Sequence, residues 1–307
     1  MSAIVIDRLT KQFGDFTAVD DVSLEVPDGQ LVAVLGPNGA GKTTTLEILE
    51  GFIAPTAGTV RVLGVDPRRG DRRWRARIGL VLQSTSLDAE LTVRDTLSVF
   101  AGLYPAPRPV GEVLELVDLA DDAETRVGAL SGGQRRRVDV AIGIIGRPEV
   151  LFLDEPTTGL DPEARRRAWT AVQNLTATGT TVMLTTHYID EAEHLASRLV
   201  LLAAGRVVAD TTPEGLRSQG GPATIRCRLA AGAPLADLPA TLAGHVDRDT
   251  NALVVRAGDI TVALRDLLAW ADRHHLDLAG LEVGPPSLED AYLAAIGAPR
   301  TPEGARS

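Results

Sequence analysis

Eight consecutive residues read Gly36-Pro37-Asn38-Gly39-Ala40-Gly41-Lys42-Thr43. They match the phosphate-binding loop pattern Gly-x4-Gly-Lys-Ser/Thr at every specified position. The preceding residues 30–35 (QLVAVL) predict a short buried strand, and residues 43–50 (TTTLEILE) predict a helix. Glycines allow a tight turn whose backbone N–H groups face inward at the positive end of that helix, which favours bound phosphate. We therefore expect Lys42 to reach the β- and γ-phosphates of a nucleotide and the Thr43 hydroxyl to ligate Mg²⁺.

Composition and charge narrow the class of protein. The 307 residues suit about two domains, and the hydrophobic content of 44% is that of an ordinary globular protein. The formal net charge of −10 disfavours nucleic acid as a partner, because nucleic acid is bound by clustered positive charge. Short arginine runs do not overturn this, and we expect them to be solvated helix faces: Arg72-Arg73, Arg135-Arg136-Arg137 and Arg165-Arg166-Arg167.

The sequence carries no signal for secretion or membrane insertion. Its first residues, MSAIVIDRLTKQF, lack the positive start and the apolar core of a signal peptide. No apolar run approaches the ~18 residues that a membrane span needs. Cys227 is the single cysteine, which excludes an intrachain disulfide and suits a reducing compartment. We expect a soluble protein that reaches a membrane only through a partner.

Alternating strand and helix patterns predict an α/β fold over residues 1–217, with a mainly parallel sheet. Amphipathic segments interrupt the strand pattern and predict a mostly helical subdomain at about 84–146. The expected strands are 3–9, 22–26, 59–63, 78–82, 150–153, 181–185, 199–202 and 206–209, the last two as a hairpin, and the expected helices are 92–104, 111–119, 162–178 and 189–196.

A smaller α+β unit is expected at 222–307, after the polar, glycine-containing stretch 218–222. Its expected strands are 224–229, 251–256 and 276–283, and its expected helices are 260–274 and 287–296. The closing helix carries one apolar stripe, with Leu288, Ala291, Tyr292 and Ala295 at helical spacing. We expect this unit to be an accessory domain that helps to pair subunits or to regulate the protein. The other reading, that the stripe only seals the core of this unit, stays open.

Two carboxylates follow an apolar strand in Val150-Leu151-Phe152-Leu153-Asp154-Glu155. A strand buried on both faces carries Asp154 to the carboxyl edge of the sheet, where the phosphate loop also opens. There Asp154 can hold Mg²⁺ through water, and Glu155 can polarise an attacking water molecule.

The stretch Leu130-Ser131-Gly132-Gly133-Gln134 begins a predicted helix with a serine cap and two glycines. Its position upstream of the Asp154-Glu155 pair resembles the signature of the ATP-binding-cassette (ABC) ATPases. The resemblance covers residues 3–210 and implies a phosphate-loop NTPase cassette that hydrolyses ATP with Mg²⁺. It also implies a head-to-tail homodimer, in which the signature of one subunit closes over the γ-phosphate held by the other.

By the same resemblance, further residues receive roles. Phe13 stacks on adenine, Gln83 contacts the metal and the attacking water, and His187 is the switch histidine near the γ-phosphate. Asp161 belongs to a loop that crosses between subunits. Each also has an ordinary reading, as a core residue, a helix cap or a buried ring. The expected catalytic residues are Glu155, His187, Gln83 and Lys42. The expected Mg²⁺ ligands are Thr43, Gln83 and Asp154. The expected ATP-binding residues are Phe13, Gly36, Pro37, Asn38, Gly39, Ala40, Gly41, Lys42, Thr43, Thr44, Ser131, Gly132, Gly133, Gln134 and Asp161.

Two stretches resemble one branch of this family, the bacterial drug and antibiotic exporters of the daunorubicin-resistance kind. They are residues 185–193 (TTHYIDEAE) and, in the tail, residues 286–293 (PSLEDAYL). The resemblance implies an ATPase subunit on the cytoplasmic face of the membrane, peripheral through a separate permease. The alternatives are a soluble ABC ATPase that remodels an assembly and an importer ATPase.

Overall fold

The computed structural model describes residues 2–82, 86–219, 221–230, 233–242, 244–247 and 252–297. The chain divides into two compact units, Met1–Pro213 and Glu214–Ser307. The predicted boundary, between residues 217 and 222, lies just beyond this division. The difference is one helix, α8 (Pro213–Gln219), which the sequence reading does not anticipate.

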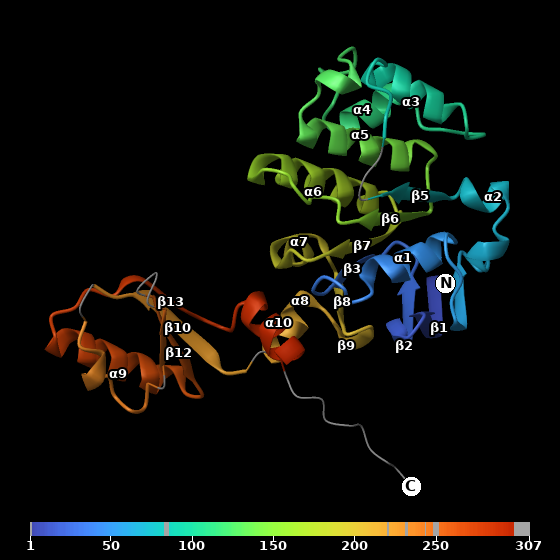
Figure 1. Ribbon diagram of the computed structural model, residues 1–307. Coiled ribbons are helices and arrows are strands. Elements are labelled where there is room, and N and C mark those ends of the chain that lie inside the picture. Colours follow the sequence, from blue (N-terminus) through green and yellow to red (C-terminus); the bar gives the residue numbers. More distant parts are fainter. Residues whose placement is uncertain are drawn as a thin grey trace, which may run out of the picture. The chain divides into compact units, whose positions relative to one another are not determined.

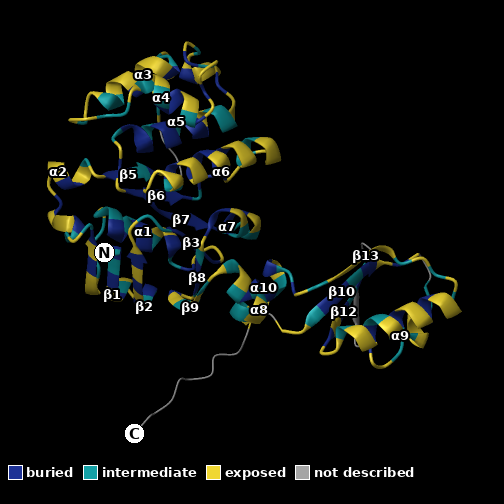
Figure 2. Cartoon of the chain, turned by 180° about the vertical axis from the view of Figure 1, so that it is seen from behind, coloured by how far each residue is buried: buried dark blue, intermediate teal, exposed yellow. Residues whose placement is uncertain are grey.

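A six-stranded sheet forms the centre of the first unit (Figure 1). Its order is β5-β6-β7-β3-β8-β9, and all neighbours are parallel except β8 and β9, which form the expected antiparallel hairpin. The central strands β3, β6 and β7 are buried along their whole length, as the apolar runs of β3 and β6 predict (Figure 2). The strands are β3 (Leu31–Leu35), β5 (Ile78–Val81), β6 (Val150–Asp154), β7 (Thr181–Thr186), β8 (Arg198–Ala203) and β9 (Arg206–Thr211).

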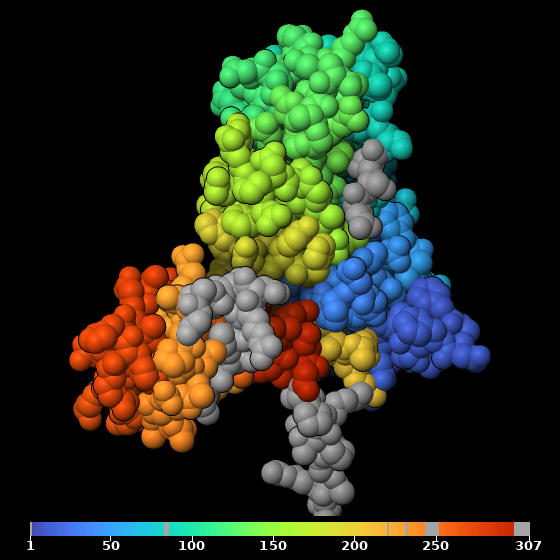
Figure 3. Space-filling model, turned by 60° about the vertical axis from the view of Figure 1, so that its left-hand side comes forward, coloured from blue at the N-terminus to red at the C-terminus, as the bar shows by residue number. Residues whose placement is uncertain are grey.

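Helices and a second sheet surround this centre. The three-stranded antiparallel sheet has the order β2-β1-β4, and its apolar side chains join those of the central sheet in one core. The segment expected to be helical forms one end of the unit, in teal and green (Figure 3). The remaining elements are β1 (Ser2–Phe13), β2 (Phe16–Pro27), β4 (Ala57–Val62), α1 (Lys42–Glu50), α2 (Arg72–Arg75), α3 (Val93–Ala101), α4 (Val110–Leu116), α5 (Gly132–Ile145), α6 (Pro162–Ala177) and α7 (Ile189–Leu195).

One arginine run differs from its predicted state. Residues 135–137 lie on α5, and the expectation of a solvated face is wrong for Arg136 and Arg137, which are both buried. Their guanidinium groups donate to backbone carbonyl groups of distant segments, which offsets much of the cost of their burial, although Arg137 Nε is buried without a hydrogen-bond partner. The sequence does not reveal this, because the acceptors come from other elements.

The second unit is an antiparallel sheet of order β11-β12-β10-β13 with helices beside it. Residues of α9, including Leu267 and Trp270, pack with the strands in a separate core. Leu288, Ala291 and Tyr292 of the apolar stripe are buried, but they lie outside that core cluster. The elements are β10 (Ala223–Arg228), β11 (Gly244–Asp247), β12 (Ala252–Ala257), β13 (Ala279–Gly284), α9 (Ile260–Arg273) and α10 (Leu288–Gly297). Within the described residues no helix has the length and apolarity to cross a bilayer.

Candidate active site

The phosphate loop joins β3 to α1 in a conformation that needs its glycines. Gly41 is the residue before α1 and has φ of 96°, in the left-handed region that glycine tolerates. A Cβ atom on Gly41 would lie 2.3 Å from the Ala18 carbonyl oxygen, and one on Gly36 would lie 2.3 Å from the Leu202 carbonyl oxygen. Side chains at these positions would therefore displace the loop from the neighbouring strands.

Lys42 is the first residue of α1, and its side chain is only 5% exposed. Its ammonium group donates to the carbonyl oxygens of Gly36 (2.8 Å) and Pro37 (3.1 Å), within its own loop. Burial lowers the pKa of Lys42, and the nearby carboxylates of Glu155 and Asp154 oppose this effect. The loop thus holds a cation at the start of α1, where the end of the helix also favours an anion, an arrangement suited to a phosphate chain.

Asp154 is the last residue of β6, and its carboxylate contacts the first turn of α1 after the phosphate loop. Its Oδ1 accepts from the hydroxyl groups of Thr43 (3.3 Å) and Thr185 (2.5 Å). Strands β6, β7 and β3 are adjacent and parallel, so their carboxyl ends meet at one edge. A hydroxyl and a carboxylate side by side supply the hard oxygen ligands that Mg²⁺ prefers, so Thr43 and Asp154 fit this ion. The third expected ligand, Gln83, lies outside the described residues.

Glu155 lies at the centre of the charged groups. Its φ is 45°, an uncommon value for a residue other than glycine, and such values occur often at functional sites. Its backbone N–H donates to the Thr185 carbonyl oxygen (3.1 Å), and Thr158 Oγ1 donates to its Oε2 (3.1 Å). Its Oε1 lies 3.2 Å from His187 Nδ1 and 3.9 Å from Lys42 Nζ. The carboxylate is thus held between a cation and a titratable ring.

A hollow of about 470 Å³ opens over these groups, and residues 38–44, Glu155 and His187 all line it. Phe16, which is 61% exposed, also lines it. Phe13 pairs with Phe16 across the turn between β1 and β2, is 49% exposed and does not line the hollow. Lys11 Nζ lies 4.7 Å from the Phe13 ring centroid. The adenine-stacking role of Phe13 therefore stays a prediction, with Phe16 as a neighbouring candidate.

The signature residues form a helix start away from this hollow. Ser131 caps α5: its Oγ accepts from Gln134 N (3.2 Å), and Gln134 Oε1 accepts from Ser131 N (2.9 Å). A Cβ on Gly132 would meet open space, whereas one on Gly133 would lie 2.9 Å from the Ala164 side chain. The start of α5 therefore presents small residues and backbone amides, as an anion-binding surface requires.

Asp161 also caps a helix. Its carboxylate accepts from the backbone N–H groups of Glu163 and Ala164, both at 2.9 Å, at the start of α6. The hydrogen bond from Ala164 is the main reason that the pKa of Asp161 is lowered. This is the ordinary reading given above, and the role between subunits stays a prediction.

Sequence reasoning missed several residues that support the site. Thr185 bonds to both Asp154 and the backbone of Glu155, and Thr158 bonds to the Glu155 carboxylate. The carboxylate of Glu191, on α7, is buried and accepts from Trp169 Nε1 (3.2 Å). Burial raises the pKa of Glu191, and hydrogen bonds from Thr186, Thr157 and Trp169 and the Arg165 charge oppose the rise. Only the hydroxyl types of residues 185–186, at the end of a buried strand, gave any signal of this support.

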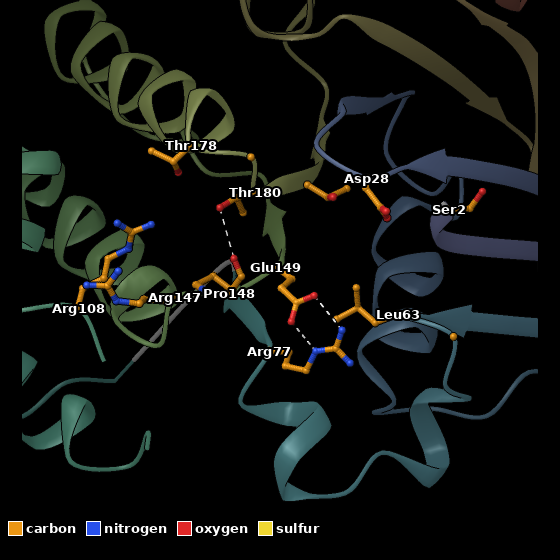
Figure 4. Close-up of a pocket in the computed structure, with 13 residues that line it drawn as sticks. Ser2, Asp28, Leu63, Arg77, Arg108, Arg147, Pro148, Glu149, Thr178 and Thr180 are labelled. Carbon is orange, nitrogen blue, oxygen red and sulfur yellow. Dashed lines mark hydrogen bonds and ion pairs between the residues drawn. The ribbon is translucent and has the colours of Figure 1, made fainter. Parts of the chain in front are cut away.

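A larger hollow of about 680 Å³ lies at the opposite, amino edge of the sheet (Figure 4). Two of its charged residues, Arg77 and Glu149, form a paired ion contact (2.5 and 2.8 Å). Arg108 is bonded to Glu112 (2.7 Å). None of the expected site residues lines this hollow, so size alone does not identify the site.

Comparison with known families gives two matches. A model of the ABC transporter family matches residues 19–158. A model of the C-terminal domain of ABC transporter domain-containing protein-like sequences matches residues 223–287.

Curated proteins match over nearly the whole chain. A daunorubicin resistance ATP-binding protein of Streptomyces coeruleorubidus is 40% identical over 96% of both chains. The daunorubicin/doxorubicin resistance ATP-binding protein of Streptomyces peucetius is 39% identical and covers 97% of this chain and 93% of its own. The Nod factor export ATP-binding protein I of Burkholderia orbicola is 36% identical, and the match covers 97% of this chain and 98% of that protein.

Solved structures match about two thirds of the chain or slightly more. The ATP-binding subunit of an ABC transporter superposes with a TM-score of 0.64 at 26% identity, over 71% of this chain and 93% of its own. A dimeric bacterial ABC transporter cassette superposes with a TM-score of 0.61 at 27% identity, over 68% of this chain and 98% of its own.

Proposed function

Because the chain belongs to the ATP-binding subunits of the ABC transporters, and is thus an ABC ATPase, we propose that it powers export of a drug or antibiotic through a separate membrane permease. One observation carries the exporter assignment: the similarity to the daunorubicin resistance proteins runs through the second unit as well as the cassette. A cassette alone would match transporters of either direction. The chain then acts on the cytoplasmic face of the membrane, where its permease holds it.

In this proposal Glu155 accepts a proton from the attacking water. Its Oε2 accepts from Thr158 Oγ1 (3.1 Å), and Glu155 lines the hollow. His187, 3.2 Å from Oε1, orients the carboxylate and faces the γ-phosphate. Lys42 neutralises charge on the β- and γ-phosphates in place of its present loop carbonyl partners.

Thr43, Asp154 and Gln83 would hold Mg²⁺, which supplies charge neutralisation on the phosphates when bound. The 3.3 Å contact of Thr43 with Asp154 supports two of these three ligands. The residues of this chain position the phosphates and move the proton.

Two copies complete each site in this proposal. The capped start of α5, with Ser131, Gly132, Gly133 and Gln134, would bind the γ-phosphate held on the loop of the partner subunit. Its support is chemical: the first amides of a helix lack partners within that helix and favour an anion. Asp161 would lie at the same interface.

Copurification tests the exporter assignment. We expect the chain, expressed with the membrane proteins of its host and extracted in mild detergent, to copurify with a permease of several membrane spans. Membrane vesicles that contain the pair should accumulate an anthracycline in an ATP-dependent manner when inside-out. Recovery with a soluble assembly instead would support the remodelling alternative, and uptake by right-side-out vesicles would support an importer.

A further inference from the structure

Arg136 joins α5 to the backbone at the ends of β5 and β6. Its side chain is 8% exposed, and its donors reach four carbonyl oxygens of two distant segments. Nε donates to Pro156 (2.8 Å), Nη1 donates to Leu82 (2.5 Å), and Nη2 donates to Asp154 (2.9 Å) and Glu155 (3.2 Å). One buried side chain therefore fixes three consecutive carbonyls around the proposed general base.

A guanidinium suits this position for a geometric reason. It is planar and carries donors in a rigid fork, so one group can bond to carbonyls that point inward from different directions. Its charge is balanced by Asp139, whose Oδ2 lies 3.6 Å away on the same helix. A lysine ammonium has three donors on a flexible stem and cannot make the same set of bonds.

The backbone that Arg136 holds is unusual. Within residues 154–156, Glu155 has a φ of 45°, a value that residues other than glycine seldom adopt. The direction of its side chain therefore depends on contacts that hold this backbone conformation in place. Through Nη1 the same guanidinium also holds the carbonyl group of Leu82, the last described residue before Gln83. The helix that carries Arg136 begins directly after Ser131.

We propose that Arg136 is a positioning residue for ATP hydrolysis, which fixes Glu155 against α5 and so couples the signature at the start of α5 to the carboxylate of the same chain. The inference rests on the proposed role of Glu155 and does not depend on the exporter assignment.

The next residue offers a matched control. Arg137 lies on the same helix, and its side chain is 9% exposed. It also donates to backbone carbonyls, those of Val117 and Asp118, and to the Asp118 carboxylate. These acceptors follow α4 and do not touch Glu155. Lysine at either position keeps the positive charge but loses the buried guanidinium group with its hydrogen bonds. The two variants should therefore lose comparable amounts of stability.

The experiment compares Arg136→Lys with Arg137→Lys in the full chain. We expect Arg136→Lys to lower kcat for ATP about ten- to a hundredfold, since displacements of about 1 Å at a reacting group can cost this much. Its KM and its affinity for a fluorescent ATP analogue should change less than about threefold, because the phosphate loop is untouched. The kcat of Arg137→Lys should stay within about threefold of wild type. Rates are expressed per nucleotide-binding site, so partial unfolding does not count as lost catalysis.

Equal kcat values for the two lysine variants would overturn the inference. Combination with Glu155→Gln gives a second test: if Arg136 acts through Glu155, Arg136→Lys should lower kcat no further in that background, and a full additional loss refutes it. If Arg136→Lys does not fold, Arg136→Gln is compared with Arg137→Gln, with the same expectations. Wild-type turnover in Glu155→Gln alone would instead refute the proposed role of Glu155.

Discussion

Replacing Glu155 by glutamine removes one negative charge from the site and leaves the size of the side chain almost unchanged. The amide oxygen can still accept from Thr158, which now bonds to Oε2 at 3.1 Å. The amide cannot accept a proton from water, and it faces His187 and Lys42 with no charge. The substitution therefore separates the chemistry of the carboxylate from its packing.

The structure sets the expected size of each effect. Loss of a general base typically costs about 10²–10⁴-fold in rate, or about 3–5 kcal/mol of barrier. The carboxylate also lies 3.9 Å from Lys42 Nζ. At an effective dielectric constant of about 20, charges at this distance attract by about 4 kcal/mol, an interaction that bound phosphates would replace. Glu155→Gln also removes a negative charge near the γ-phosphate, so ATP should bind at least as tightly as in wild type.

The assay is phosphate release at saturating ATP and Mg²⁺, with size-exclusion chromatography in the presence of ATP. We expect a kcat at least about a hundredfold below wild type and an ATP-dependent dimer. Glu149→Gln is the control: Glu149 begins the same stretch of chain, and its ion pair with Arg77 lies at the opposite edge of the sheet (Figure 4). It should leave kcat within about twofold, because exposed ion pairs contribute little. A folded Glu155→Gln with a loss below about tenfold would refute the reasoning.

Four other perturbations have defined outcomes. Lys42→Ala should abolish ATP binding or turnover in a folded protein, measured by nucleotide titration and phosphate release; retained affinity and rate would contradict the site. Of Phe13→Ala and Phe16→Ala, the one that removes the adenine contact should raise KM by about 5- to 100-fold with kcat kept, since base stacking contributes about 1–3 kcal/mol, and the other should not. Burial, and to a lesser extent two neighbouring carboxylates, raises the pKa of Glu50 from 4.5 to about 7 in the folded protein. The folded protein therefore holds this proton more tightly than the unfolded chain does, and the free energy of unfolding falls as pH rises from about 4.5 to 7. Urea titrations should therefore show that Glu50→Gln is more stable than wild type at pH 8, by about 2 kcal/mol more than at pH 5; an advantage independent of pH would contradict this origin. Truncation after Pro213 should leave a folded ATPase, because the two units have separate core clusters; aggregation in light scattering would show that they depend on each other.

Several parts of the site could be predicted because their chemistry is local in the chain. The phosphate loop needs a strand, glycines with permitted φ values, a lysine and a hydroxyl, and all of these are consecutive residues. The Ser131 cap and the Asp154-Glu155 strand end are short motifs of the same kind. Unbroken apolar runs also predicted the buried parallel strands, because a strand covered on both faces has no polar side.

What depends on contacts between distant segments could be decided only by the tertiary structure. The arginines at 136 and 137 appear in sequence as part of a basic run, yet both are buried, and backbone carbonyls of distant segments accept hydrogen bonds from them. The approach of His187 to Glu155, at 3.2 Å, depends on the order of β6 and β7 in the sheet. The sequence therefore determined which groups could bind phosphate and move a proton. The packing of α5 against the ends of the strands decided how Glu155 is held, since a backbone carbonyl carries no sequence signature of its partner.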